Sequence, residues 1–369
     1  MRKTGINIIV TVMLLTLAGC ASGSGASAGT NTTQQAAATD NSMAEASAQV
    51  QQDATAEVAV TTQDTVSTED GAGEEESSAA TDTSAQGTPV VYFTEDITAG
   101  GLVKLYEQLG FEPTGNLAVK VSTGEPPASN YLRQELIGEL VSSLNGTYVE
   151  CLTAYGGQRS SVAMAKQVAE DHGFVPFDLL DENGSMTLAV SDYKVISENY
   201  VGAGMANYDS MLVLSHFKGH QMAGFGGAIK NISIGLGSAE GKSWIHSGGK
   251  SKSNPWGGDQ EAFTESMAEA ADTVQDYYGD RIVYINVMNR LSIDCDCNGH
   301  PAEPDIHDIG ILASYDPVAL DQACYDLILQ AEGNESFVSR VESRMGIHTL
   351  EHAEAIGLGS RTYELVKEQ

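Results

Sequence analysis

Positive charge is scarce in this chain of 369 residues, which has 19 Lys and Arg against 50 Asp and Glu. Proteins that bind nucleic acids or dock on anionic lipids need clusters of Lys and Arg, so the composition argues against both kinds of partner. Cysteine is scarce as well, and five cysteines do not make the disulfide framework of small secreted domains. The apolar stretch 8–17 has only ten residues, too few for a permanent membrane-spanning helix.

The first twenty residues resemble the signal sequence of a bacterial lipoprotein. Arg2 and Lys3 precede the apolar stretch, and Leu-Ala-Gly-Cys at 17–20 is similar to the lipobox. The resemblance implies cleavage before Cys20, acylation of its thiol, and anchoring to lipid on the extracytoplasmic face of the cell membrane. The alternative is an ordinary signal peptide in which the cysteine occurs by accident.

Residues 21–88 contain no Lys, Arg or aromatic residue, and they hold eleven of the acidic residues. Such a segment buries too little apolar surface to offset its chain entropy, so we predict a disordered tether of roughly 45 Å root-mean-square span. The chain is thus expected to comprise a signal peptide (1–19), a lipid-anchored acidic tether (20–88) and a folded domain (89–369). With 39 acids and 17 bases, that domain keeps a net charge near −22, which is compatible with cation binding.

From Pro89 onward, apolar segments of strand length alternate with longer segments of helical periodicity. The pattern predicts α/β architecture, with a mostly parallel sheet or sheets and flanking helices. A division near residue 205 into two α/β lobes with a cleft between them is the alternative to a single sheet. We expect strands at 90–93, 117–121, 148–152, 211–214 and 282–287, and helices at 102–109, 131–144, 160–172, 259–278 and 316–331.

Polar, glycine-rich segments follow three of the predicted strands. They are Thr-Gly-Glu-Pro-Pro at 123–127, Thr-Ala-Tyr-Gly-Gly-Gln-Arg at 153–159, and the segment 215–235. In open α/β sheets, ligands bind beyond the carboxyl ends of the strands. We therefore expect a small-molecule site where these segments meet.

The segment 215–235 combines His216, His220 and Lys230 with five glycines. Histidines can transfer protons, and a lysine can bind an anion or act as a nucleophile if burial lowers its pKa. The two histidines would share a face on a helix, but the glycines argue against one. Gly226 and Gly227 permit a tight turn and close approach of the backbone to a cofactor. The alternative is that the histidines are structural and the lysine lies on the surface.

A further cluster at residues 294–308 contains acids, thiols and imidazoles suited to a metal ion. Its candidate ligands are Cys295, Cys297, Asp305 and His307. The Cys-x-Cys spacing differs from that of zinc ribbons, and a bridge within it would close a strained small ring, so we do not expect that disulfide. Cys151 and Cys324 can be free, bridged or metal-bound, and Cys324 is expected in the core.

The glycine-rich stretch 244–259 is predicted to be a long binding loop or lid. His246, Lys250 and Lys252 are unusual within an acidic protein, and they could receive a carboxylate or a phosphate.

Four motifs resemble the bacterial and archaeal family called domain of unknown function 362. They are Ser-His-Phe-Lys-Gly-His at 215–220, Gly-Gly-Ala-Ile-Lys-Asn at 226–231, Asp-Cys-Asp-Cys at 294–297, and the stretch 308–324. The resemblance extends over about residues 90–366. Some members of that family carry an added ferredoxin-like domain and are described as iron–sulfur proteins. The present chain has no Cys-x2-Cys-x2-Cys run, so an iron–sulfur cluster does not follow from the resemblance.

The stretch 219–235 is also similar to the core motif of nickel-pincer lactate racemases. In those enzymes a histidine is followed ten residues later by the lysine that carries the nickel cofactor, and twenty-six residues later by a nickel-binding histidine. His220, Lys230 and His246 match this spacing. The resemblance implies acid–base chemistry at His220, cofactor attachment at Lys230 and nickel ligation by His246.

This chain departs from the racemase pattern in two places. Tyr155 lies where the racemases have an earlier catalytic histidine, and it could replace that histidine as acid or base. Glu125 lies near the place of a substrate-binding arginine, which argues against an identical substrate.

Three hypotheses follow from these patterns. The first is a metal-dependent enzyme, isomerase-like or redox-like, that acts on a small molecule at His216, His220, Lys230 and Tyr155. Its metal could be nickel, zinc or iron. The second is a non-catalytic lipoprotein that binds a metal ion or a small acid, and the third gives the clusters a purely structural role. We predict that the 294–308 cluster and the His/Lys segment meet in space.

Overall fold

The computed structural model describes residues 87–368. The predicted signal peptide, Cys20 and most of the predicted tether lie outside these residues. No helix within them is both long enough and apolar enough to cross a membrane.

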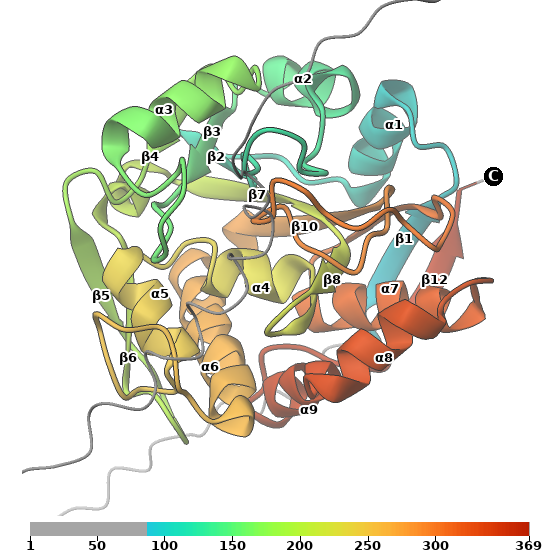
Figure 1. Ribbon diagram of the computed structural model, residues 1–369. Helices are drawn as coiled ribbons and strands as arrows, with labels where there is room; N and C mark the ends of the chain where they lie inside the picture. The colour runs from blue at the N-terminus through green and yellow to red at the C-terminus, as the bar shows by residue number, and fades with distance from the viewer. Residues whose placement is uncertain (1–86, 369) are drawn as a thin grey trace, which may run out of the picture. The chain divides into compact units, whose positions relative to one another are not determined.

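A single eight-stranded sheet forms the centre of the described chain (Figure 1). The strand order is β12-β1-β11-β10-β7-β2-β3-β4, and every neighbouring pair is parallel except the two that involve β11. Its strands are β1 (Val90–Thr94), β2 (Leu117–Lys120), β3 (Thr147–Glu150), β4 (Phe177–Leu179), β7 (Ser210–His216), β10 (Ile282–Met288), β11 (Gly310–Ser314) and β12 (Glu364–Lys367). The predicted mostly parallel sheet is confirmed. The two-lobe alternative is not adopted, because strands from both sides of residue 205 pair directly.

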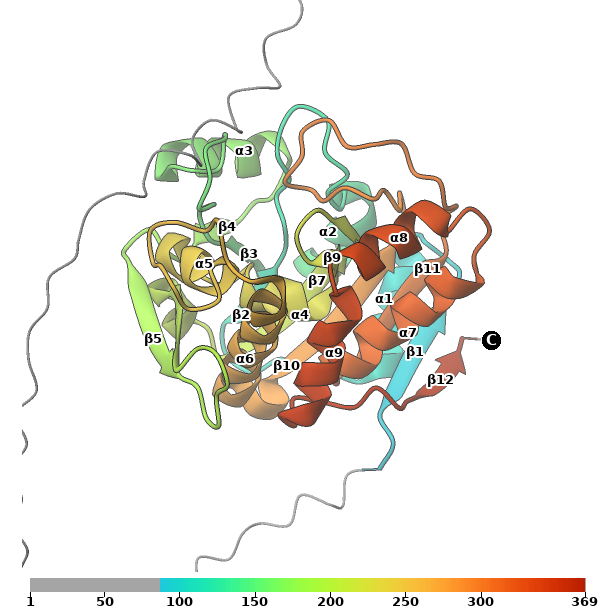
Figure 2. The same ribbon diagram turned by 60° about the horizontal axis from the view of Figure 1, so that its bottom comes forward.

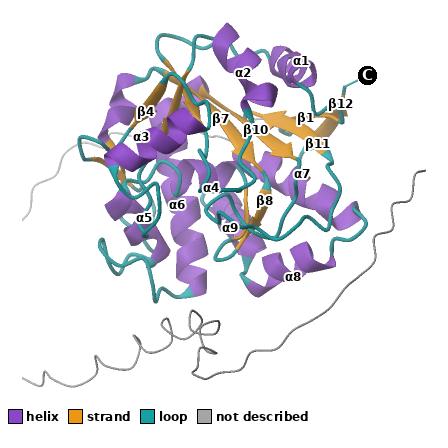
Figure 3. Cartoon of the chain, turned by 45° about the horizontal axis from the view of Figure 1, so that its top comes forward, coloured by secondary structure: helices purple, strands orange, loops and turns teal. Residues whose placement is uncertain are grey.

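Helices cover both faces of the sheet, as Figures 2 and 3 show from two further directions. One face carries α1 (Ala99–Leu109), α2 (Gln134–Ser143) and α3 (Val162–Asp171). The other carries α4 (Ala228–Ser233), α6 (Gln260–Tyr278), α7 (Pro317–Gln330), α8 (Glu335–Ser343) and α9 (Gly346–Ala355). The remaining elements are α5 (Ala239–His246), the hairpins β5 (Ser185–Ala189) with β6 (Glu198–Gly202) and β8 (Lys218–His220) with β9 (Gly224–Gly226), and short 3-10 turns at Ala203–Asn207 and Gly279–Arg281.

The sequence of the central strand β7 does not alternate between apolar and polar residues at 211–214, because both faces of this strand are buried. Met211 and Val213 pack into the core on the α4–α9 side, whereas Leu212 and Leu214 pack into the core on the α1–α3 side. A strand that is buried on both faces needs apolar residues at every position.

The segment 215–235 changes structure twice within its length. Strand β7 ends at His216, a β8–β9 hairpin follows, and α4 then carries Lys230. His216 thus ends strand β7 and His220 ends strand β8, so the two histidines do not share a helix, as the glycines indicated. The predicted loop 244–259 was placed too early, because α5 continues to His246 and only the residues after it form the loop.

A buried carboxylate from α7 fixes the start of α4. Asp321 accepts hydrogen bonds from the backbone N–H groups of Ala228 and Ile229, at 2.8 and 3.0 Å. These are donors that the first turn of a helix leaves without partners. Gly227 makes room for this carboxylate, since a Cβ added there would lie 2.2 Å from Asp321 Oδ1. The predicted cofactor role of Gly227 therefore gives way to a packing role.

We expect Gly227→Ala to lower the free energy of unfolding by about 2–3 kcal/mol, because the added methyl displaces the cap of α4. Urea unfolding followed by circular dichroism measures this change. Gly100→Ala is the control, because nothing but the Thr98 hydroxyl oxygen, at 3.8 Å, lies near an added Cβ in that exposed first turn of α1. Equal stabilities of the two variants would contradict the packing role.

Candidate functional site

The polar segments that follow β2, β3 and β10 meet at one edge of the sheet. Arg159 bridges two carboxylates there, with Nε 3.1 Å from Glu125 and Nη1 3.0 Å from Glu150. Thr123 donates its hydroxyl to Glu150, and the backbone N–H of Glu125 donates to the carbonyl of Asp296 at 2.7 Å. The predicted meeting of the segments 123–127 and 153–159 is confirmed, and the third predicted segment, 215–235, contacts this edge where Asn231 accepts a hydrogen bond from Lys120 at the end of β2.

Asp296 links the Cys-x-Cys loop to the histidine segment. Its buried carboxylate lies 2.8 Å from His216 Nδ1 and 3.1 Å from Lys218 Nζ. Although burial opposes ionisation, Lys218 and His216 hold the pKa of Asp296 far below its ordinary value. The two segments thus meet as predicted.

The catalytic role predicted for His216 does not fit this arrangement. Its Nδ1 faces the Asp296 carboxylate, and its Nε2 lies 2.7 Å from the carbonyl oxygen of Asn289. Both neighbours are acceptors, so both ring nitrogens must donate and neither remains for a substrate. His216 instead positions the loop that carries Asp296.

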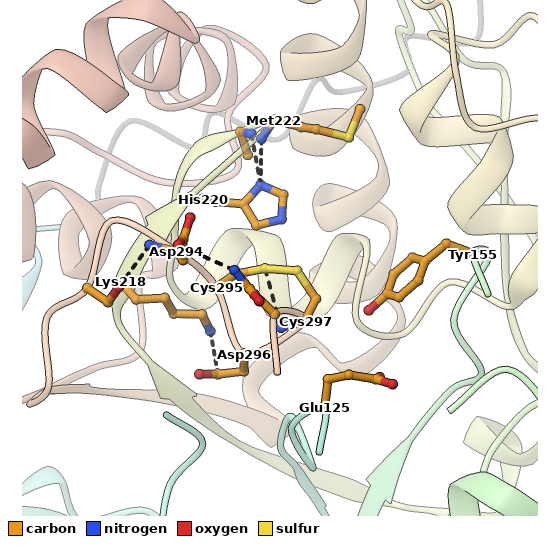
Figure 4. Close-up of a disulfide and its surroundings, with 12 residues drawn as sticks. Glu125, Tyr155, Lys218, His220, Met222, Asp294, Cys295, Asp296 and Cys297 are labelled. Atoms are coloured by element: carbon orange, nitrogen blue, oxygen red, sulfur yellow. Dashed lines mark hydrogen bonds and ion pairs between the residues drawn. A yellow bond between two sulfur atoms is a disulfide. The ribbon is translucent and has the colours of Figure 1, made fainter. Parts of the chain in front are cut away.

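Cys295 and Cys297 form a disulfide (Figure 4). The prediction that these two cysteines would not pair, because the bond closes a small ring, is therefore wrong. A ring nitrogen of His220 and the two sulfur atoms all lie within 4.8 Å of one another. The paired sulfurs are not thiolates, so in this oxidised form they do not offer the predicted metal ligands. In the same view Tyr155 and Glu125 lie across the disulfide from Lys218.

His220 is held in one protonation state by the turn that follows it. Its Nδ1 accepts hydrogen bonds from the backbone N–H groups of Met222 and Ala223, at 3.2 and 2.9 Å. The proton of the neutral ring must therefore lie on Nε2. Burial and then the charge of Lys230 keep the pKa of His220 well below its ordinary value. His220 thus presents a neutral N–H donor, which differs from the acid–base role that the resemblance implies.

His246 has the opposite tautomer. Its Nδ1 donates to the carbonyl oxygen of Lys242 at 2.7 Å, and its ring stacks on Phe263. Burial lowers the pKa of His246 to about 4, although this backbone hydrogen bond opposes the shift. The unprotonated Nε2 is available to a ligand, and a backbone carbonyl behind the ring is the usual support of a metal-binding histidine.

Lys230 lies among other lysines. Burial, followed by the charges of Lys218, Lys242 and Lys120, lowers the pKa of Lys230 to about 7. The side chain keeps part of its surface exposed, and its amine has no hydrogen-bond partner among residues 87–368. A substantial fraction of the amine is therefore neutral and nucleophilic near pH 7.

Sequence reasoning missed the other three members of this lysine group, which are Lys120, Lys218 and Lys242. Lys120 ends the buried strand β2 and donates to Val121 and Asn231, and burial lowers its pKa to about 8. Lys242 is buried in α5 and donates to the carbonyl of Gly237. Lys120 had a recognisable signal, because a lysine within an apolar strand is unusual in a chain with so few bases.

Other predicted residues lie close to the lysines or to the sheet edge. Two lysine side chains pass close to Gly226. A Cβ added at Gly226 would lie 3.2 Å from Lys230 Cδ and 3.5 Å from Lys218 Cε. Its lack of a side chain lets both amines reach the site. Tyr155 accepts a hydrogen bond from Arg159 at 3.1 Å, and burial raises the pKa of Tyr155.

The predicted ligands Asp305 and His307 are exposed and belong to neither of the two groups of metal-binding residues found in the described chain. Asp305 accepts a hydrogen bond from Ser336 instead. Lys250 is exposed, and Lys252 packs on the ring of Tyr200.

Cys151 and Cys324 are free and buried, and Cys324 lies in the core as expected. The second group of side chains that could hold a metal ion is Glu261, Glu265 and His348, where Lys194 Nζ lies 2.6 Å from Glu265 and supplies a positive charge.

The comparison with family models agrees with the motifs of the domain-of-unknown-function family. The family model described as Domain of unknown function (DUF362) matches residues 117–326. Among solved structures, the lactate racemase apoprotein from Thermoanaerobacterium thermosaccharolyticum has 13% identity and a TM-score of 0.33, over 53% of this chain and 50% of that chain. A protein of known crystal structure from Thermotoga maritima has 13% identity and a TM-score of 0.35, over 70% and 58%. This chain thus spans little more than half of either structure, and no curated protein matches it.

We expect Lys230 to react with an amine-acylating reagent at a rate that rises through about pH 7, because the neutral amine appears above its pKa. Peptide mass spectrometry over a pH series measures the rate. Lys252 is the internal control, because its hydrogen bond with Tyr200 raises the pKa of Lys252. Parallel pH profiles for the two lysines would contradict the assignment.

We expect Asp296→Asn to lower the free energy of unfolding by about 3–5 kcal/mol, because it leaves two buried cations without their counter-charge. Asp294→Asn is the matched control two residues away. Its partly exposed carboxylate lies 3.7 Å from Arg340, and its loss should cost less than about 1 kcal/mol. Thermal and urea unfolding of both variants test the difference.

Proposed function

This chain belongs to the family described as Domain of unknown function (DUF362), and we propose that it is a metal-dependent enzyme acting on a small anionic molecule at Lys230, His220 and His246. The chemistry proposed is isomerase-like or redox-like. The observation that carries the proposal is the surroundings of Lys230, an amine with a pKa of about 7 beside two neutral imidazoles.

The lysines account for the charge of the proposed substrate. Burial, followed by the charges of neighbouring lysines that include Lys218 and Lys242, lowers the pKa values of Lys120 and Lys230, so positive charge is disfavoured at both amines. A bound carboxylate or phosphate would relieve that repulsion, since charges interact strongly where water is sparse. The rest of the domain is strongly acidic, which makes this concentration of positive charge specific to the site.

The residues also fit the nickel-pincer cofactor that the spacing of His220, Lys230 and His246 implies. Lys230 offers a free, partly neutral amine for covalent attachment, and His246 offers Nε2 for the metal. When bound, such a cofactor would supply the electron-accepting centre of an isomerisation. His220 would donate its Nε2 hydrogen to an oxygen of the substrate that becomes negative, a role for which a neutral imidazole is suited.

Tyr155 would act differently from the racemase histidine to which it was compared, and Arg159 would not serve as a substrate-binding arginine. Arg159 is committed to Glu125 and Glu150, so the cationic contacts to a substrate would come from the lysines. Burial favours the neutral form of Tyr155, which can donate its proton, and the hydrogen bond from Arg159 would favour the phenolate that results. These differences support a substrate other than that of the racemases.

The cellular location is a further part of the proposal. The lipobox-like sequence around Cys20 supports an acylated protein on the extracytoplasmic face of the membrane, with the tether separating the enzyme from the lipid.

The first test is intact mass and elemental analysis of the protein purified from its native membrane. We expect added mass on the peptide that contains Lys230, together with nickel, and loss of both in Lys230→Arg. His246→Gln should keep the added mass and lose most of the metal, because it removes one ligand but not the amine. Lys252→Arg is the control that should keep both.

Other results would change the assignment. An unmodified Lys230 together with zinc or iron would overturn covalent attachment and leave a metal centre of another kind. A protein with neither metal nor added mass, yet with affinity for small carboxylates, would support the alternative of a non-catalytic binding lipoprotein.

A further inference from the structure

We propose that Cys295 and Cys297 are a redox-active disulfide that exchanges two electrons with a small dithiol or a dithiol protein. The inference rests on the surroundings of the two sulfurs, and it does not depend on the function proposed for Lys230.

The position of the bridge argues against a stabilising role. A disulfide stabilises a fold mainly by restricting the unfolded chain, and the effect grows with the length of the closed loop. Here the two cysteines are only two residues apart, so the bridge restricts almost nothing beyond its own loop. It lies instead beside His220 at the edge of the sheet where the polar segments meet.

The two cysteines are unequally exposed, and an exchange reaction requires that one sulfur can be reached. Cys297 is partly exposed, whereas Cys295 is only 5% exposed. An external thiolate can therefore reach Cys297, and Cys295 becomes the leaving sulfur. The backbone N–H of Cys297 already donates to Cys295 Sγ at 3.4 Å, and a ring nitrogen of His220 lies within 4.8 Å of both sulfurs. The backbone N–H would stabilise a thiolate on Cys295.

The reaction balances with one dithiol. Its first thiolate attacks Cys297 Sγ, a new S–S bond forms, and the Cys295–Cys297 bond breaks with its electron pair on Cys295. The second thiol of the reductant then attacks the mixed disulfide and releases Cys297. The reductant leaves as a cyclic disulfide, and its two protons are taken up by Cys295 and Cys297.

The loop is held in place without the bridge, so reduction would leave the sulfurs adjacent. Asp296, between the two cysteines, is bound by His216 and Lys218, and its carbonyl oxygen accepts from Glu125. On the other side, Gly219 donates to the carbonyl of Ser292 at 2.8 Å. A Cβ at Gly219 would lie within 2.5 Å of the backbone of Ile293, so only glycine allows this approach. Reoxidation by the disulfide form of the same dithiol reverses these steps: the Cys297 thiolate attacks that disulfide, and Cys295 then attacks Cys297 in an intramolecular step between fixed partners and releases the reduced dithiol.

The test uses the folded, oxidised protein in buffers of reduced and oxidised glutathione, and in dithiothreitol. After quenching by alkylation, peptide mass spectrometry identifies free and modified cysteines. We expect both thiols of the pair to become free while circular dichroism and the melting temperature stay unchanged. Cys151 and Cys324 are internal controls and should remain unmodified unless the protein unfolds. A pair that is reduced only in denaturant, or thiols that are never paired in the native protein, would overturn the proposal.

Two single variants test the assigned order of attack. In Cys295→Ser, the accessible Cys297 should form a mixed disulfide with oxidised glutathione. In Cys297→Ser, the buried Cys295 should react at least about tenfold more slowly. Equal rates would refute the assignment of Cys297 as the attacked sulfur. The wild-type reduction experiment decides the main proposal even if a variant fails to fold.

Discussion

The buried ion triad of Asp296, His216 and Lys218 connects the parts of the site. It joins a loop after β10 to the end of β7 and the start of the β8–β9 hairpin. Three charges are removed from water together, which is tolerable only because each has a close partner. The triad sets where Cys295 and Cys297 lie relative to His220, and through the carbonyl of Asp296 it also holds the segment of Glu125.

The second constraint is the placement of positive charge in an acidic protein. Lysines from β2, β8, α4 and α5 converge, and burial lowers the pKa values of Lys120 and Lys230. The Asp321 cap places α4 against the hairpin so that Lys230 extends over Gly226. A reactive amine thus results from packing and repulsion among like charges, with no carboxylate paired directly to it in the described chain.

His220 has two chemically different neighbours. Its neutral ring contributes an N–H donor, the disulfide lies beside it, and the charge of Lys230 helps to keep its pKa low. An N–H donor can stabilise negative charge on a substrate oxygen or on a sulfur. The amine chemistry and the sulfur chemistry proposed at this edge of the sheet would therefore share His220 as a common neighbour.

The sequence by itself determined the α/β class, most strands and helices, and the residue types at the strand ends. The spacing of apolar residues marks strands and helices, and glycines mark where they end, and both signals are local. It also indicated His220, Lys230 and His246 through their spacing. Only the tertiary structure decided that His216 has no free nitrogen, that Cys295 pairs with Cys297, that Asp305 and His307 lie apart, and that Lys120 and Lys242 join the site. Tautomers, pairing and pKa values depend on neighbours distant in sequence, which no local pattern records.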